Sequence, residues 1–167
     1  MITQNEIIKS AINPAYLLLP QKMNSRAATS IMLSIGFQES GFSARRQVIS
    51  IVIDGKKVLA PKGAATGWWQ FEEGGGVKGV MEHKATSELA RTVCHARGVP
   101  FVRRAVWEAL ETDDVLAAAF CRLLMWTDSG KLPTTEADGW AMYARTWRPG
   151  RPHPDKWPAS WKFGLSV

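Results

Sequence analysis

The sequence of 167 residues predicts a single, mainly α-helical domain that carries one small β-hairpin. The first observation behind this prediction is an apolar stripe, because Ala28, Met32 and Ile35 follow one another at the spacing of one helix face. The second is a pair of β-prone runs within 47–60 that flank an Asp-Gly pair at 54–55, a strong signal for a tight hairpin. A chain of this length can also bury a hydrophobic core of its own.

The N-terminal part is predicted to form two short helical pieces. Residues 3–12 place their apolar side chains on one side of a helix. Asn13-Pro14 is expected to end that helix, because proline has no N–H to donate and its ring collides with the preceding turn. Residues 15–19 are expected to form a short apolar turn or helix that Pro20 stops.

The central helix is predicted to run to about Glu39. Either Asn24 or Ser25 is expected to cap it, since short oxygen-bearing side chains accept hydrogen bonds from the free N–H groups of a first turn. Gly36 predicts a closely packed neighbour, because glycine inside a helix costs about 1 kcal/mol relative to alanine. Gly41 is well placed to end the helix.

Four further helices are expected in the second half of the chain, and a tail is expected after them. The helices are predicted over 77–96, over 100–110, from Thr112 or Asp113 to 126, and from Thr134 or Thr135 to 147. Residues 148–167 contain four prolines, so they are expected to be an irregular Pro- and Trp-rich C-terminal tail that aromatic side chains pin to the body.

The chain is basic, with 21 Lys and Arg against 15 Asp and Glu and a formal net charge of +6. Such a balance favours an anionic partner, such as nucleic acid, an acidic lipid surface or the bacterial cell wall. The basic residues are scattered and form no recognised nucleic-acid motif, so no nucleic-acid partner is expected. No apolar run approaches the ~20 residues that span a bilayer, so no stable membrane insertion is expected. Residues 1–10 also lack the pattern of a standard signal peptide.

The cysteines and histidines predict neither a metal site nor a cofactor. Cys94 and Cys121 lie in apolar helical patterns and are expected to be buried free thiols, although the sequence leaves a disulfide open. His83, His95 and His153 are too scattered for a set of metal ligands.

Glu39 is the leading candidate for chemistry. It follows Ile35 by four residues, so it continues the apolar face of the central helix, where a carboxylate is not expected. Burial there would penalise the charged form and raise the pKa of the carboxyl. A carboxyl that stays protonated near neutral pH can act as a general acid. The alternative is a helix-end glutamate that turns out to solvent.

Two short motifs carry a resemblance to a known family. Residues 39–42 read Glu-Ser-Gly-Phe, and residues 67–70 read Gly-Trp-Trp-Gln after a Gly-Ala pair at 63–64. In this order they resemble the soluble lytic transglycosylases of the lysozyme-like superfamily. A third motif of that family, Ala-Tyr-Asn-Ala-Gly, has a partial counterpart in residues 142–145. The resemblance covers about 25–148, and the hairpin is an insertion between the first two motifs.

The resemblance implies a lysozyme-like α+β fold in which the central helix ends at a catalytic glutamate and the hairpin lies beside the cleft. It implies cleavage of the β-1,4 bond between N-acetylmuramic acid and N-acetylglucosamine in peptidoglycan. In the family one glutamate, here Glu39, first protonates the bridging oxygen and then takes the proton of the muramic acid 6-hydroxyl, which gives a 1,6-anhydro sugar. A compact domain of this kind resembles a bacteriophage endolysin or virion-associated enzyme that acts on the cell wall in the periplasm as a monomer.

The same resemblance suggests residues that bind the glycan. Ser40 is expected to contact the sugar or to orient Glu39, Gln70 to line the cleft, and Tyr143 to contact Glu39. One of three aromatic side chains around Gln70 is expected to face the cleft and stack on a sugar while the others pack. These three are Trp68, Trp69 and Phe71.

Two alternatives stay open. A true hydrolase, as in goose-type lysozymes, would use a second carboxylate, for which Asp54, Glu72 and Glu73 are candidates. A non-catalytic relative would bind glycan or serve as a structural part of a virion. The sequence does not decide between anhydro and hydrolytic products, between exo and endo action, or between hosts.

Overall fold

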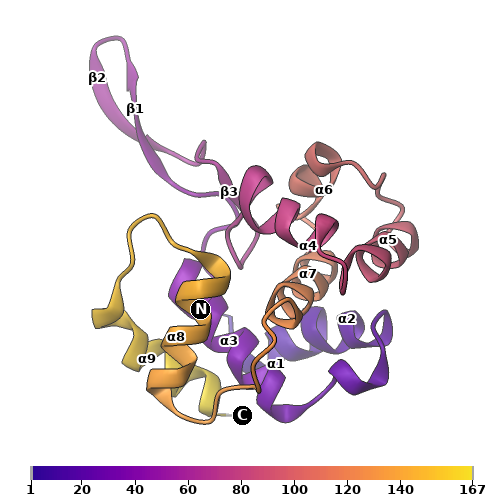
Figure 1. Cartoon of the computed structure of the whole chain (residues 1–167). Coiled ribbons are helices and arrows are strands. Elements are labelled where there is room, and N and C mark those ends of the chain that lie inside the picture. Colours follow the sequence, from indigo (N-terminus) through magenta and orange to yellow (C-terminus); the bar gives the residue numbers. More distant parts are fainter. Residues whose placement is uncertain (1, 167) are drawn as a thin grey trace.

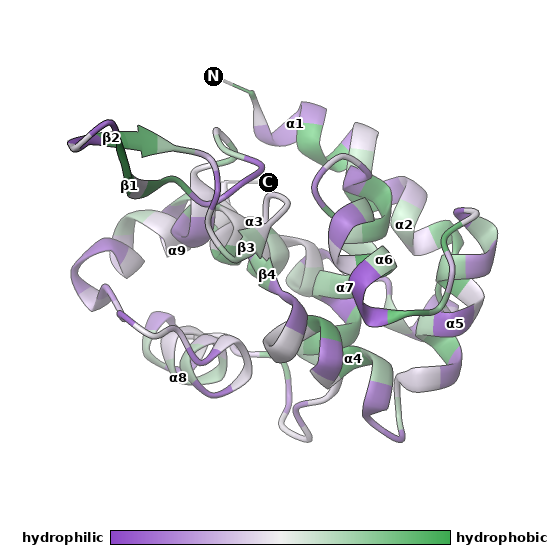
Figure 2. Ribbon diagram, turned by 90° about the horizontal axis from the view of Figure 1, so that it is seen from above, coloured by the Kyte–Doolittle hydropathy of each residue, from purple (hydrophilic) through white to green (hydrophobic). Residues whose placement is uncertain are grey.

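The computed structural model describes residues 2–166 and is mainly helical, with two small antiparallel sheets (Figure 1). Helix α3 lies between the pair α8 and α9 on one side and helices α4 to α7 on the other (Figures 1 and 2). No helix in this described range is long and apolar enough to cross a membrane. The elements in chain order are α1 Gln4–Ile7, η1 Ile8–Ile12, α2 Asn13–Leu17, η2 Gln21–Met23, α3 Arg26–Ser40, β1 Ile49–Ile53, β2 Lys56–Ala60, β3 Ala65–Thr66, β4 Phe71–Glu72, η3 Glu73–Val77, α4 Lys78–Glu82, α5 Ser87–Ala96, α6 Arg103–Ala109, α7 Asp114–Trp126, α8 Glu136–Trp147, η4 Pro154–Lys156 and α9 Trp157–Leu165.

The central helix α3 has the ends that its sequence predicts. Ser25 is its N-cap, and the Ser25 hydroxyl accepts the N–H of Ala28 at 3.1 Å. Gly41 ends the helix in the left-handed conformation, with φ +58°. Gly36 is packed against the ring of Phe42 so closely that no Cβ would fit there. The helix is therefore held from both ends and buried along its middle, which places Glu39 in its last turn at the edge of the core.

The prediction of an irregular tail over 148–167 is wrong for residues 154–165, which are helical. Residues 157–165 form helix α9, which packs along α3, and η4 comes just before it. Pro154 and Pro158 lie in the first turns of η4 and α9. In a first turn the backbone N–H groups have no acceptor within the helix, so proline loses no hydrogen bond there, and its ring meets no preceding turn. The prolines therefore mark where helices begin, whereas their number suggested that no helix forms.

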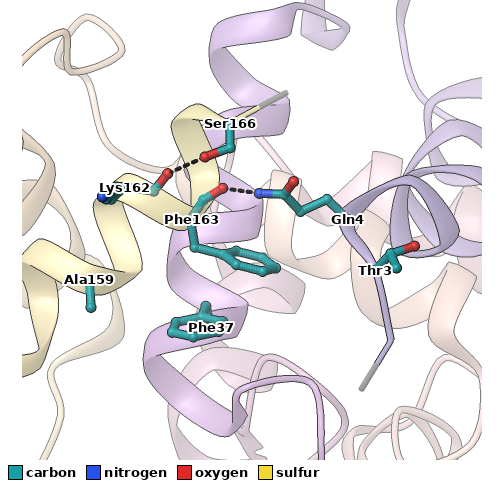
Figure 3. Close-up of a pocket in the computed structure, with 7 residues that line it drawn as sticks. All are labelled: Thr3, Gln4, Phe37, Ala159, Lys162, Phe163 and Ser166. Carbon is teal, nitrogen blue, oxygen red and sulfur yellow. Dashed lines mark hydrogen bonds between the residues drawn. The ribbon is translucent and has the colours of Figure 1, made fainter.

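Close contacts hold α9 against α3. Phe37 of α3 stacks on Phe163 of α9 with ring centroids 4.4 Å apart (Figure 3). Gly164 lies directly on α3, where a Cβ would collide with the Ser34 hydroxyl and the Ser30 carbonyl. Because the two helix backbones come this close, the side of α3 that faces α9 is buried.

The N-terminal helix also differs from its prediction, because Asn13-Pro14 does not break it. The chain passes from α1 through the π-helical segment η1 into α2 without leaving helical backbone angles. The Asn13 N–H donates to the Ile8 carbonyl, five residues back. A π turn is wider than an α turn, and this widening accommodates Pro14 in the first turn of α2.

Two of the other expected helices are shorter than their patterns suggested. The helix expected over 77–96 is interrupted, because α4 ends at Glu82 and His83 is extended before α5 starts at Ser87. The helix expected from residue 100 begins at Arg103.

The predicted hairpin is present and projects away from the helices (Figure 1). Strands β1 and β2 pair from Ile49↔Ala60 to Ile53↔Lys56, so Asp54 and Gly55 alone form the turn. Both have positive φ, +49° and +76°, as a type I′ turn requires. Its strands carry exposed apolar side chains. In Figure 2 much of the ribbon of β1 and β2 has the hydrophobic colour. Strands β3 and β4 form the second sheet and hold the 67–70 loop between them.

Candidate active site

Glu39 lies in the last turn of α3, where its side chain is partly buried. The Tyr143 hydroxyl donates to Glu39 Oε1 at 2.6 Å. Burial raises the pKa of Glu39 from 4.5 to about 7; the hydrogen bond from Tyr143 opposes this rise, and the negative charge of Glu72 adds to it. The carboxyl is therefore divided between its protonated and charged forms near neutral pH, which suits a group that gives a proton in one step and takes one in the next.

Tyr143 is held rigidly by three tryptophans. Its ring stacks on Trp157 at 5.3 Å and 15°, and it contacts Trp140 at 5.4 Å and Trp147 at 6.3 Å. The side chain is buried, and burial together with the charge of Glu39 holds the pKa of its phenol well above the usual value. Tyr143 thus stays a neutral hydroxyl that can donate its proton to the Glu39 carboxylate.

Ser40 joins the end of α3 to the loop that carries the second motif. Its hydroxyl contacts the Trp68 carbonyl at 2.7 Å and the Gly36 carbonyl at 3.3 Å, and it accepts the N–H of Phe42 at 3.1 Å. The hydroxyl proton is engaged with these carbonyls. The structure therefore places Ser40 as a residue that positions the helix end and the loop, and not as a donor aimed at a sugar.

Gln70 ends the 67–70 loop in a conformation that few side chains adopt, with φ +50°. Its backbone N–H and its side-chain Nε2 both donate to the Gly67 carbonyl, at 3.0 and 2.9 Å. Gly67 itself has φ +73° and lies against the Leu110 carbonyl, where a Cβ would collide. The loop is therefore tightly defined, and Gln70 is partly exposed at its end.

The expectation that one aromatic side chain around Gln70 faces a cleft is not met. Trp68 is 4% exposed, Trp69 0% and Phe71 1%. Trp69 donates its indole N–H to the Met32 carbonyl at 2.8 Å, inside the core. Phe71 packs edge-on against Phe120. Trp69 and Phe71 are thus core residues, because the β3–β4 turn points its large side chains inward onto α3 and α7.

The partly exposed aromatic side chains next to Tyr143, the partner of Glu39, are Trp140 and Trp147, which the motif comparison missed. Both belong to α8, three residues before Tyr143 and four residues after it. This spacing puts all three rings on one helix face. This spacing can be read from the sequence once Tyr143 is taken as a site residue, so the sequence could have predicted the two tryptophans beside it. Trp147 is also tied to the second motif, since its indole N–H donates to the Trp69 carbonyl at 3.0 Å.

Of the three candidate second carboxylates, Glu72 is the one whose charge acts on Glu39. It stands on β4, two residues after Gln70, and its side chain is exposed. Glu73 instead forms an ion pair with Arg104 at 3.4 Å. Asp54 lies at the turn of the projecting hairpin (Figure 1).

Three other features of residues 2–166 bear on the chemistry, namely a hollow beside α9, the potential metal ligands and the two cysteines. A hollow of about 530 Å³ lies on the α1 and α9 side of α3, and Figure 3 shows Gln4 Nε2 donating to the Phe163 carbonyl at its rim. Its lining residues include no carboxylate. Within residues 2–166 no three His, Cys, Asp or Glu side chains are grouped as metal ligands. Cys94 and Cys121 are buried free thiols, as expected from their patterns.

The chain was compared with protein-family models, with curated proteins and with solved structures. No protein-family model, no curated protein and no solved structure matches this chain.

Proposed function

We propose that this protein is a peptidoglycan lytic transglycosylase with a lysozyme-like fold and that Glu39 is its single general acid and base. The observation that carries the proposal is a partly buried carboxyl at the end of the core helix, with its pKa raised to about 7 and a tyrosine hydroxyl donating to it. The order of the two motifs in the sequence supports the choice of substrate.

The proposed reaction uses Glu39 twice. Protonated Glu39 gives its proton to the oxygen that bridges N-acetylmuramic acid and N-acetylglucosamine, as the bond from that oxygen to the anomeric carbon breaks. The Glu39 carboxylate then takes the proton of the muramic acid 6-hydroxyl, whose oxygen bonds to the same anomeric carbon. Tyr143 stabilises the carboxylate between the two steps through its 2.6 Å hydrogen bond. No water is consumed, and the product is a 1,6-anhydro sugar.

The 6-hydroxyl has a physical advantage over water as the nucleophile. It is tethered to the reacting sugar, so it has the high effective concentration of an intramolecular group. Activation of water normally needs a second carboxylate that acts as base. This asymmetry favours the transglycosylase over the hydrolase.

Hydrolysis is the second candidate function, and Glu72 is the residue that supports it. Its negative charge reaches Glu39, and its exposed side chain is free to activate water as the second carboxylate of a lysozyme-type hydrolase. A non-catalytic role in glycan binding or in a virion is the third possibility, and it would not depend on the carboxyl of Glu39.

Zymography on purified peptidoglycan, followed by mass spectrometry of the released muropeptides, tests the proposal. Wild type is expected to clear the gel and to release 1,6-anhydro products, whereas Glu39→Gln is expected to do neither. Glu72→Gln separates the two enzymes, with Glu73→Gln as the matched control because Glu73 is held by Arg104. Reducing-end products from wild type, combined with an inactive Glu72→Gln and an active Glu73→Gln, would establish the hydrolase instead. No clearing by folded wild type would establish the non-catalytic role.

A further inference from the structure

Arg122 is a buried cation that has no carboxylate partner among residues 2–166. It lies in the middle of α7, and its side chain is 2% exposed. Its Nε donates to the Met23 carbonyl at 2.8 Å, and its guanidinium lies 5.0 Å from the Trp126 ring centroid. Among the described residues no carboxylate pairs with Arg122, and its two Nη atoms donate no hydrogen bond, although they are not completely enclosed. A largely buried guanidinium without a carboxylate partner is costly, and an anion placed at its two Nη atoms would offset that cost.

Arg122 lines a pocket of about 400 Å³ beside the N-terminal end of α3. Lys22 lines the same pocket and brings a second positive charge, 5.6 Å from the Trp126 ring centroid. The acidic side chain in the lining is Asp128, and it is already held by a two-pronged ion pair with Arg145 at 2.8 and 2.9 Å. The pocket is therefore left with an excess of positive charge.

The rest of the lining indicates what kind of anion fits. Met125, Trp126 and Leu132 form an apolar wall next to the two cations. A planar guanidinium matches a carboxylate with two parallel hydrogen bonds, and an apolar wall buries an aliphatic group. A free inorganic anion would use the charges but would leave the apolar wall uncovered.

We propose that this pocket binds a carboxylate attached to a small aliphatic body, of the kind found at the C-terminal end of a short peptide. Arg122 and Lys22 hold the carboxylate, and the wall around Trp126 holds the aliphatic part. The pocket begins at Ser25, at the opposite end of α3 from Glu39, about 21 Å away at 1.5 Å per residue. The proposal is therefore independent of the function proposed for Glu39.

The test is a titration followed by NMR of the tryptophan indole N–H signals, with the Trp126 signal assigned from Trp126→Phe. The probes are acetyl-alanyl-alanine, its C-terminal amide and inorganic phosphate. The peptide acid is expected to shift the Trp126 signal to saturation, whereas the amide is expected to bind at least about tenfold more weakly, because it lacks the charge that strengthens such hydrogen bonds. Phosphate is expected to bind more weakly than the peptide acid.

Variants show whether the two cations are responsible. Arg122→Met is expected to weaken binding of the acid at least about tenfold, and Arg122→Lys is expected to recover only part of it, because lysine lacks the planar fork. Lys22 is exposed, so Lys22→Met tests the site without disturbing the core, and it is expected to weaken binding about two- to fivefold. Lys84→Met, at another exposed lysine, is the matched control for net charge and is expected to change nothing.

Three results would overturn the proposal. One is equal binding of the acid and the amide, and another is unchanged binding of the acid in Lys22→Met. The third is the absence of any shift at Trp126 in folded wild type, which would leave Arg122 with a purely structural role as a donor to the Met23 carbonyl. Phosphate binding tighter than the peptide acid would reassign the pocket to an inorganic anion and would also reject the carboxylate.

Discussion

Replacing Glu39 by glutamine should stabilise the protein in a pH-dependent way. The pKa of Glu39 is raised from 4.5 to about 7 by burial, so the folded state keeps a proton that the unfolded chain releases. Below pH 4.5 both states hold the proton, and the carboxyl carries no penalty. Between pH 4.5 and 7 the unfolded chain gives up its proton while the folded state keeps it, so the free energy of unfolding falls. Above pH 7 the folded state also holds the charge, and the loss is complete. Glutamine has the same shape and never ionises.

The size of the effect follows from the two pKa values. One pKa unit corresponds to about 1.36 kcal/mol, so a rise from 4.5 to about 7 is worth about 3 kcal/mol in the free energy of unfolding. Glu39→Gln should therefore match wild type near pH 4, gain stability between pH 4.5 and 7, and exceed wild type by about 3 kcal/mol above pH 8. The pKa of about 7 already includes the effect of the hydrogen bond from Tyr143, so this bond adds no separate contribution to the 3 kcal/mol.

Urea unfolding of both proteins at several pH values between 4 and 9 measures this difference. Glu82→Gln is the matched control, because Glu82 is an exposed carboxyl on α4, and its difference from wild type should not vary with pH. A difference between Glu39→Gln and wild type that is flat across the same range would show that Glu39 ionises normally. The physical basis for its role as a general acid at neutral pH would then be lost.

Four further predictions address the site, the packing and the charge. Tyr143→Phe removes the hydrogen bond that opposes the raised pKa of Glu39, so the alkaline limb of kcat/KM should move up by about 0.5 to 1 pH unit; a limb that stays in place argues against this contact. Glu72→Gln should move the same limb down, retain most of the activity and still release products about 18 Da lighter than hydrolytic ones; a loss of activity above tenfold would contradict the single-carboxylate mechanism. Gly164→Ala should lower the free energy of unfolding by about 1–3 kcal/mol in urea, because its Cβ meets the backbone of α3, and a neutral effect would reject the packing of α9. Binding to insoluble cell wall should fall as salt rises, since a net charge of +6 acts through a screened field; salt-independent pelleting would make that charge incidental.

Short-range signals in the sequence were sufficient for the hairpin and for several helix ends. Ser25, Asp113 and Thr135 each cap a helix through their side-chain oxygens, and each was among the residues expected to do so. The Asp-Gly pair at 54–55 forms the two-residue turn that its chemistry favours. These features depend on a few neighbouring residues, because a cap or a tight turn is completed within one turn of backbone. They are therefore predictable without the fold.

The C-terminal segment was mispredicted because the meaning of a proline depends on its position. Pro154 and Pro158 would end a helix that had already begun, but each stands where one starts. Whether a helix forms after them is decided by what it packs against. Phe163 stacks on Phe37, which lies more than a hundred residues earlier in the chain. A short helix needs such tertiary contacts to be stable, and no local pattern contains them.

The sequence by itself determined which carboxyl is the candidate for chemistry. The spacing that continues the apolar face of α3 placed Glu39 at the edge of the core before any contact was known. Only the tertiary structure decided its surroundings: the hydroxyl of Tyr143 104 positions away, the charge of Glu72, and the burial of Trp69 and Phe71. The physical reason is that a pKa and an exposed surface are set by distance through space, whereas the periodicity of a helix is set along the chain.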